Sequence, residues 1–153
     1  MIHLVRHARA ANRGSWASDD ALRPLTADGR RQATALRELL GDVKFDRIVS
    51  SPSLRCLETV LPIAAQRLLP IEPHPALHEG SSLDGVFGLL RESAWQTSLL
   101  CTHGDVIGDL LGHLAARTDI ELGPTPQLEK GSTWVLHTND DGHITAANYL
   151  PAP

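Results

Sequence analysis

Arg6 and His7 stand side by side directly after a short apolar segment, residues 2–5, at the start of the sequence. An arginine keeps its charge near neutral pH and holds a phosphate or carboxylate through several N–H groups. A neutral imidazole can act as a nucleophile or as a base. If the apolar segment is a strand, the pair lies at its end, where it could contribute to an anion site.

Two further segments carry the same kinds of side chain. Arg55 follows the apolar run in "FDRIVS", and His103 follows the apolar run in "TSLLCT". In an open α/β sheet, ligands bind beyond the carboxyl ends of the strands. We therefore expect Arg6, His7, Arg55 and His103 to converge at one edge of a sheet. Two guanidinium groups and two imidazoles there suit a small dianion, and phosphate fits best.

Apolar residues at helical spacing fill the stretches between the predicted strands. The helix over 51–69 shows the clearest pattern, with Ser51 as its cap and Pro52 at its first helical position. A proline inside a helix removes a hydrogen bond, so Pro62 is expected to kink or shorten this one. Its apolar face is predicted from Leu54, Leu57, Leu61, Ala64 or Ala65, and Leu68. The other helices are expected over 26–41, 83–93 and 104–116.

The last third of the sequence changes character. Residues 120–132 are predicted to form a loop, and "TWVLHT" and "HITAANYL" flank the turn signal "NDDG". Strands alternating with helices, followed by a hairpin, predict an α/β fold: a three-layer α/β/α sandwich whose central sheet is mostly parallel, with an antiparallel C-terminal edge hairpin. A length of 153 residues suits one domain, over 1–153.

Composition and charge restrict the possible partners. The formal net charge is -4, which argues against general binding to nucleic acid or to an anionic membrane. No apolar run approaches the roughly 18 residues that a membrane span needs, and no signal-peptide pattern is visible. Cys56 and Cys101 lie in apolar segments and are expected to be buried, reduced thiols. We expect a cytoplasmic protein, and the sequence leaves its oligomeric state open.

Four segments in this order, "LVRHA", "SSPSLRCLET", "LHEG" and "CTHGD", resemble the signature segments of the histidine phosphatase superfamily, the phosphoglycerate-mutase-like enzymes. "RPLTADGRRQA" and the lack of large insertions resemble its short branch of SixA-type phosphohistidine phosphatases. "KGSTWVL" and "CTHGDVIGDLL" resemble the histidine-phosphatase domain attached to some Nudix hydrolases. The resemblance runs nearly end to end, and it implies a phosphatase without a metal or another cofactor.

The resemblance also implies a role for each matching residue. His7 would be the nucleophile that forms a phosphohistidine, with its other ring nitrogen donating a hydrogen bond that fixes the tautomer. Arg6, Arg55 and His103 would bind the phosphoryl oxygens and stabilise their charge during transfer. Glu79 would protonate the leaving oxygen and then activate the hydrolytic water, so that the catalytic residues are His7, Glu79 and His103.

The sequence departs from the family pattern after the nucleophile. The family usually has glycine after the histidine and a hydroxyl residue two positions later, where this chain has Ala8 and Ala10. One phosphate contact is then missing or replaced by a neighbour. Trp16 could stack on a base or sugar, and Arg23 could be another phosphate contact. The possible substrate-contact residues are Arg9, Asn12, Arg13, Trp16 and Arg23.

The substrate and the outcome of the reaction stay open at this point. A phosphohistidine protein, or a small phosphorylated metabolite or nucleotide, would each present the phosphoryl group that the site requires. A phosphoglycerate-mutase-type phosphotransferase and a non-catalytic phosphate-binding module are the alternative functions. The remaining histidines form no HExxH pattern and no CxxC-type ligand set, so no metal site is predicted.

Overall fold

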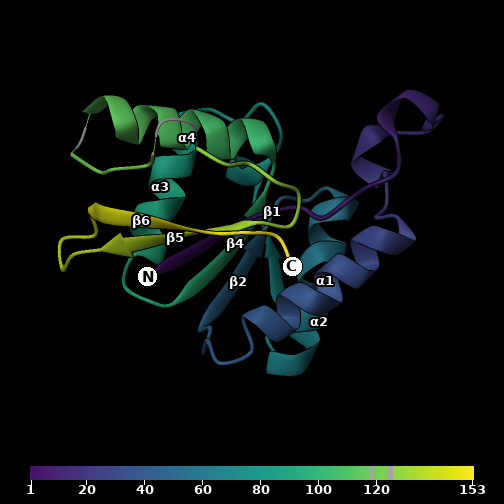
Figure 1. Ribbon diagram of the computed structural model, residues 1–153, viewed down its shortest axis with the longest axis horizontal. Coiled ribbons are helices and arrows are strands. Elements are labelled where there is room, and N and C mark those ends of the chain that lie inside the picture. Colours follow the sequence, from purple (N-terminus) through teal and green to yellow (C-terminus); the bar gives the residue numbers. More distant parts are fainter. Residues whose placement is uncertain (118, 124–125) are drawn as a thin grey trace.

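A mixed sheet of six strands forms the centre of the computed structural model, which describes residues 1–117, 119–123 and 126–153 (Figure 1). The strand order is β3-β2-β4-β1-β5-β6. The parallel part contains β1 (Ile2–Arg6), β2 (Arg47–Ser50), β3 (Ile71–Pro73) and β4 (Ser98–Thr102). The hairpin of β5 (Thr133–Thr138) and β6 (Ile144–Leu150) adds an antiparallel edge next to β1. This confirms the predicted α/β fold with its mostly parallel sheet and C-terminal hairpin.

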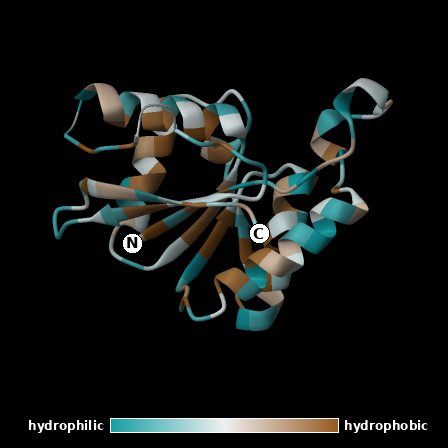
Figure 2. Cartoon of the chain, in the orientation of Figure 1, coloured by the Kyte–Doolittle hydropathy of each residue, from teal (hydrophilic) through white to brown (hydrophobic). Residues whose placement is uncertain are grey.

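Helices cover both faces of the sheet. Helices α1 (Ala27–Leu39) and α2 (Leu54–Arg67) lie on one face, and α3 (Leu83–Ser93) and α4 (Gly104–Arg117) lie on the other (Figure 1). Side chains of a strand alternate between the two faces, so β1 contributes to two cores. Leu4 packs with residues of α3 and α4, whereas Val5 packs with residues of α1 and α2. Figure 2 shows the resulting apolar strands between helices whose outer faces are polar.

Helix α2 differs from its prediction in its start and in its buried face. It begins at Leu54 after the cap residue Ser53, two residues later than expected, and Pro62 does not end it. The side chains of Leu61 and Leu68 are 55% and 91% exposed. Ala64 is buried as predicted, but the rest of the buried face consists of Arg55, Cys56, Thr59, Val60 and Ile63. The helix is therefore rotated so that the face with the arginine meets the sheet.

Three stretches outside the regular elements complete the positioning of the site. Residues 8–23 project beside the helices and contain two short 3-10 turns, η1 (Arg13–Ser15) and η2 (Asp20–Leu22) (Figure 1). A third turn, η3 (Pro75–Leu77), follows β3. Within 120–132, the described residues form neither helix nor strand, as predicted, and 124 and 125 lie outside the described part. Among the described residues, no helix is long and apolar enough to cross a membrane.

Candidate active site

The two histidines predicted for the site meet at the carboxyl ends of neighbouring parallel strands. Arg6, the last residue of β1, is paired in register with Thr102, the last residue of β4. His7 and His103 each come next, and their ring centroids lie 5.3 Å apart. Parallel pairing of β1 with β4 is therefore what brings these two sequence-distant side chains together.

His7 is buried, with 6% of its surface exposed, and it lines a cavity of about 700 Å³. Its Nδ1 lies 2.8 Å from the carbonyl oxygen of Ala8, which can only accept a hydrogen bond, so Nδ1 carries the proton. Burial lowers the pKa of His7 to about 3, and the nearby His103, Arg55 and Arg6 act in the same direction. The imidazole is therefore neutral near pH 7, and Nε2 has a free lone pair.

Arg55 and His103 form a connected group beneath the cavity. The Arg55 guanidinium, 1% exposed, donates from Nη2 to His103 Nδ1 at 3.3 Å and to Glu79 Oε2 at 3.1 Å. Because Nδ1 of His103 accepts, its Nε2 donates to Ser51 Oγ at 2.9 Å. His103 lines the cavity, whereas Arg55 lies directly behind its wall.

Arg6 reaches the cavity from the end of β1. Its Nη1 donates to the carbonyl oxygen of Leu128, and its Nε is buried without a hydrogen-bond partner. The Nε of Arg55 is likewise buried without a hydrogen-bond partner. A buried donor without an acceptor is costly, so both guanidinium groups keep a hydrogen-bonding capacity that no described residue satisfies. Burial also lowers the pKa of Arg6, against the opposing effect of Asp105 and Glu79.

Glu79 faces the same cavity from the loop after η3. Its two oxygens accept hydrogen bonds from Arg13 Nη2 at 2.9 and 2.7 Å, in addition to the bond from Arg55. The following residue, Gly80, donates its backbone N–H to Asp105 Oδ2 at 2.7 Å. Asp105, in the first turn of α4, thus fixes the loop that carries Glu79.

The predicted substrate-contact residues divide into three groups. Asn12, Arg13 and Arg23 line the cavity, whereas Trp16 lies in an adjoining groove with Arg13 and Glu79. Arg9 lies away from the cavity, in a separate depression with Asp28 and Gln32. The structure therefore brings together Arg6, His7, Asn12, Arg13, Arg23, Arg55, Glu79 and His103, but not Arg9.

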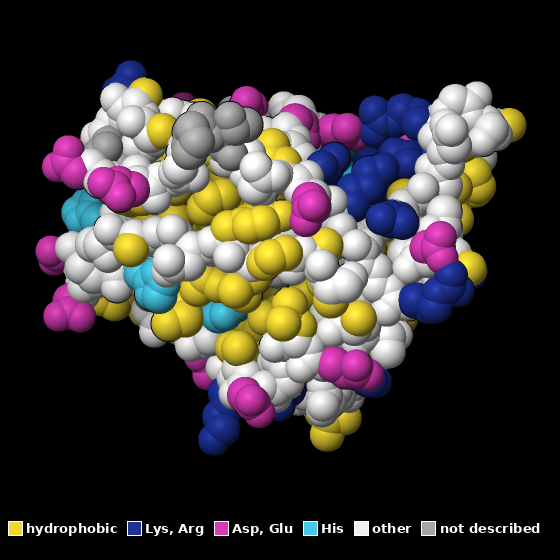
Figure 3. All heavy atoms as spheres, in the orientation of Figure 1, with side chains coloured by type: hydrophobic (Ala, Val, Ile, Leu, Met, Phe, Trp, Pro, Cys, Tyr) yellow, Lys and Arg dark blue, Asp and Glu magenta, His cyan; other side chains and the backbone are white. Residues whose placement is uncertain are grey.

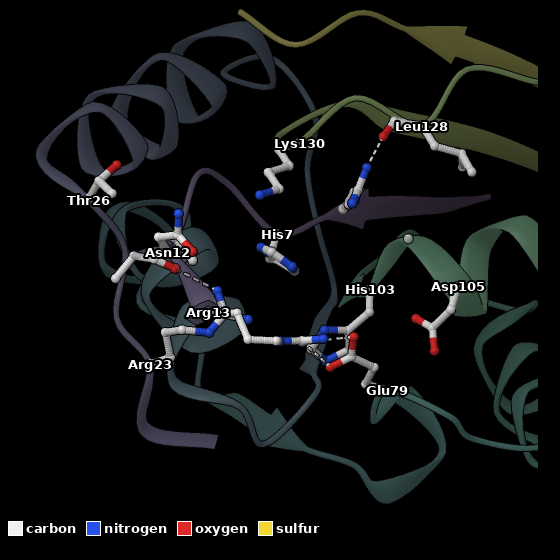
Figure 4. Close-up of a pocket in the computed structure, with 14 residues that line it drawn as sticks. His7, Asn12, Arg13, Arg23, Thr26, Glu79, His103, Asp105, Leu128 and Lys130 are labelled. Carbon is white, nitrogen blue, oxygen red and sulfur yellow. Dashed lines mark hydrogen bonds and ion pairs between the residues drawn. The ribbon is translucent and has the colours of Figure 1, made fainter. Parts of the chain in front are cut away.

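Several cavity residues were not predicted from the sequence. Lys130, Asp105 and Thr26 all line the cavity, as Figure 4 shows. Asp105 is two residues beyond His103 in "CTHGD", and that proximity was an available signal. Lys130 is the first residue of "KGSTWVL", a segment with family resemblance, but no role in the site was predicted for it. Figure 3 shows how lysines and arginines gather in a hollow beside residues 8–23, although the net charge of the chain is negative.

Two other sequence-based interpretations can be compared with the structure. Cys56 and Cys101 are both buried and free, as expected. Within the described residues, no group of three or more histidine, cysteine, aspartate or glutamate side chains could hold a metal ion.

The fold is similar to that of solved phosphatase structures. The protein histidine phosphatase SixA, solved in complex with tungstate, superposes with a TM-score of 0.79 at 23% identity, covering 96% of this chain and 93% of that one. A protein of Agrobacterium tumefaciens that has been assigned as a phosphohistidine phosphatase SixA superposes with a TM-score of 0.75 at 20% identity. The superposition covers 98% of this chain and 96% of that one. At these identities the likeness shows the fold alone.

Among curated proteins, the chain is similar to an 8-oxo-(d)GTP phosphatase of Mycolicibacterium smegmatis. The two are 32% identical over 157 residues, which cover 99% of this chain and 48% of the relative, so the chain spans about half the relative's length. An adenosylcobalamin/alpha-ribazole phosphatase of Escherichia coli is 38% identical over 79 residues, which cover 51% of this chain and 39% of the relative. Residues 2–82 match the family model of the histidine phosphatase superfamily (branch 1), and the chain belongs to that superfamily.

Proposed function

We propose that this chain is a metal-independent phosphatase that hydrolyses a phosphomonoester or phosphoramidate through a phosphohistidine intermediate on His7. The observation that carries the proposal is the state of His7: a buried, neutral imidazole whose Nδ1 proton is bound to a carbonyl oxygen, which leaves the Nε2 lone pair for attack. The family membership and the phosphatase relatives support it.

In the first proposed step, Nε2 of His7 attacks the phosphorus atom and the bond to the leaving oxygen breaks. The electron pair of that bond stays on the leaving oxygen, which receives a proton from Glu79. Arg6, Arg55 and His103 hold the phosphoryl oxygens. For His103 this requires that the anion replace Arg55 as the partner of Nδ1 and that this nitrogen then carry a proton.

In the second step, a water molecule attacks the phosphohistidine. Glu79 takes up a proton from the water, the P–N bond breaks, and its electron pair returns to Nε2 of His7. Inorganic phosphate and the neutral imidazole are regenerated. The cations around the cavity supply the positive charge that a divalent ion supplies in many other phosphoryl-transfer enzymes.

The substrate is a phosphohistidine protein or a small phosphorylated metabolite or nucleotide. The names of the relatives, a nucleotide phosphatase and a ribazole phosphatase, favour small molecules. We also propose a cytoplasmic location, supported by the two free, buried cysteines, since reduced thiols are typical of that compartment.

The test is turnover of p-nitrophenyl phosphate by the wild type and by the His7→Ala variant, with EDTA present throughout. We expect the wild type to be active and His7→Ala to lose at least about 10³-fold in kcat, because the attacking nitrogen is absent. His143→Ala, at an exposed position in the turn between β5 and β6, is the matched control and keeps full activity.

Acid-quenched reactions with ³²P-labelled substrate test the intermediate. Label bound to protein is expected in the wild type and absent in His7→Ala, and all released label is inorganic phosphate even when phosphoglycerate is present as an acceptor. Transfer of label to the acceptor would favour the mutase alternative. A wild type no faster than His7→Ala would favour the binding module, and activity only after adding a divalent ion would contradict metal independence.

A further inference from the structure

Lys130 is a cation of the cavity that the proposed chemistry does not use. Its ammonium group forms no ion pair with a carboxylate among the described residues, whereas Arg13 and Arg23, on the cavity wall, pair with Asp20. Burial lowers the pKa of Lys130, and repulsion from Arg6 and Arg23 adds to that effect. An anion bound next to Lys130 would remove this repulsion.

The backbone of Lys130 is fixed in place by the residues around it. We call residues 127–132 the strap, because they cross the end of β1. The next residue in the strap, Gly131, donates its N–H to the carbonyl oxygens of both Arg6 and His7. The carbonyl oxygen of Lys130 accepts from Gln32 Nε2 at 2.6 Å. The base of the lysine side chain is therefore held next to the nucleophile rather than on a free loop.

Two further donors lie on the same side of His7 as Lys130. Arg23 is buried and uses Nε and Nη1 for Asp20 and Ala11, which leaves Nη2 without a bond among the described residues. Asn12 accepts from Gly14 through Oδ1, so its amide N–H groups are free of any bond within the described part. Figure 4 shows Lys130, Asn12 and Arg23 on one side of His7, with Glu79 and Asp105 on the other.

The charges in the cavity are thus divided. The side with Glu79 carries carboxylates held by Arg13 and Gly80, and the side with Lys130 carries hydrogen-bond donors and positive charge. The three groups assigned to the phosphoryl group at His7 are Arg6, Arg55 and His103, so Lys130 has no role in binding that group. A volume of about 700 Å³ is also far larger than one phosphoryl group requires and lies in the range of small-molecule sites.

From this arrangement we infer that Lys130, Arg23 and Asn12 form a second anion subsite, which binds a second phosphoryl group of the substrate while the first is attacked by His7. The substrate class is a small molecule with two or more phosphoryl groups, such as a nucleoside diphosphate or a sugar bisphosphate. This inference rests on the proposed function, and it narrows the substrate from any phosphorylated compound to this class.

The test compares kcat/KM for GDP and for fructose 1,6-bisphosphate with kcat/KM for p-nitrophenyl phosphate, which has a single phosphoryl group. For each of the two substrates, the quantity compared is its kcat/KM divided by that for p-nitrophenyl phosphate. In Lys130→Met this ratio is expected to fall at least tenfold for GDP, for the bisphosphate or for both. Which ratio falls shows whether the subsite takes a nucleoside diphosphate, a sugar bisphosphate or both. Lys130→Arg restores most of the ratio, because it restores the charge. Lys44→Met removes the other lysine of the chain, at an exposed position between α1 and β2, and leaves the ratio unchanged.

A binding experiment that needs no turnover separates this inference from the proposed function. By calorimetry on His7→Ala protein, GDP is expected to bind at least tenfold tighter than GMP, and Lys130→Met in that background removes the difference. Equal ratios in Lys130→Met and Lys44→Met, together with equal binding of GDP and GMP, would overturn the second subsite even if His7 proves to be the nucleophile. If kcat/KM for a phosphohistidine peptide fell as much as that for GDP in Lys130→Met, the second subsite would also be overturned, because a substrate with a single phosphoryl group would then depend on Lys130 equally.

Discussion

At the scale of single residues, the position of Arg6 depends on a neighbour that has no side chain. A Cβ atom on Gly104 would come within 2.8 Å of Cζ and Nε of Arg6, so the guanidinium lies directly against the first residue of α4. The contact is with the far end of a flexible side chain and not with backbone. A larger residue at this position would therefore displace Arg6 rather than unfold the protein.

The Gly104→Ala variant is expected to lower kcat/KM for p-nitrophenyl phosphate by roughly 10²-fold, the effect of misplacing a positioning group by about 1 Å. Gly112→Ala is the control on the same helix, because its added Cβ meets nothing within 4 Å. That variant keeps its activity and gains about 0.5–1 kcal/mol in unfolding free energy, since alanine is the better helix former. Equal kcat/KM values for the two variants would show that the exact position of the Arg6 guanidinium does not affect the reaction.

At the scale of elements, the N-terminus of α1 rests on the backbone that follows His7. The backbone N–H and the Oγ1 hydroxyl of Thr26 both donate to the carbonyl oxygen of Arg9, at 3.0 and 3.2 Å. Thr26 Oγ1 also accepts from the N–H of Gly29 and so caps the helix, as predicted. The helix thereby fixes the start of the segment that carries Asn12 and Arg13.

This contact leaves no room for a side chain on Gly29. A Cβ atom there would lie 1.9 Å from the carbonyl oxygen of Arg9, a backbone atom that cannot move aside alone. Gly29→Ala is therefore expected to lose about 1–3 kcal/mol of unfolding free energy, as overpacked sites do. Urea unfolding measures it, with Gly88→Ala as the control in α3, where the added Cβ meets nothing. A Gly29→Ala protein as stable as that control would contradict the close approach.

The elements also show where sequence reasoning succeeds and where it fails. The pairing of His7 with His103 was predictable, because parallel strands align their carboxyl ends and each histidine follows a strand. The buried face of α2 was not predictable from apolar spacing, because burial of Arg55 rotates Leu61 towards solvent. Lys130 was missed for a related reason, since hydrogen bonds from Gly131 to the distant β1 define its position.

At the scale of the whole molecule, two buried histidines on or beside the central strand link stability to pH. Burial lowers the pKa of His3 to about 4 and that of His7 to about 3, against 6.5 in an unfolded chain. Between these values and 6.5, the unfolded state binds more protons than the folded state. The unfolding free energy therefore rises with pH in this range and falls as the solution is acidified.

From pH 7 to pH 5, the unfolding free energy is expected to fall by about 2 kcal/mol for each of these two histidines. The His3→Leu variant removes one of them, so its unfolding free energy falls by correspondingly less. Urea unfolding of both proteins at pH 7 and pH 5 measures the two losses. If wild type and variant lost the same amount, His3 would not be one of the groups responsible.

The central place of β1 has a consequence for how the protein is made. Its two partners in the sheet are β4 and β5, and the second of these begins at Thr133, near the other end of the sequence. During translation, β1 therefore leaves the ribosome well before β5, one of its two neighbours in the sheet. His7, the proposed nucleophile, is thus synthesised long before the strand that completes the sheet around it.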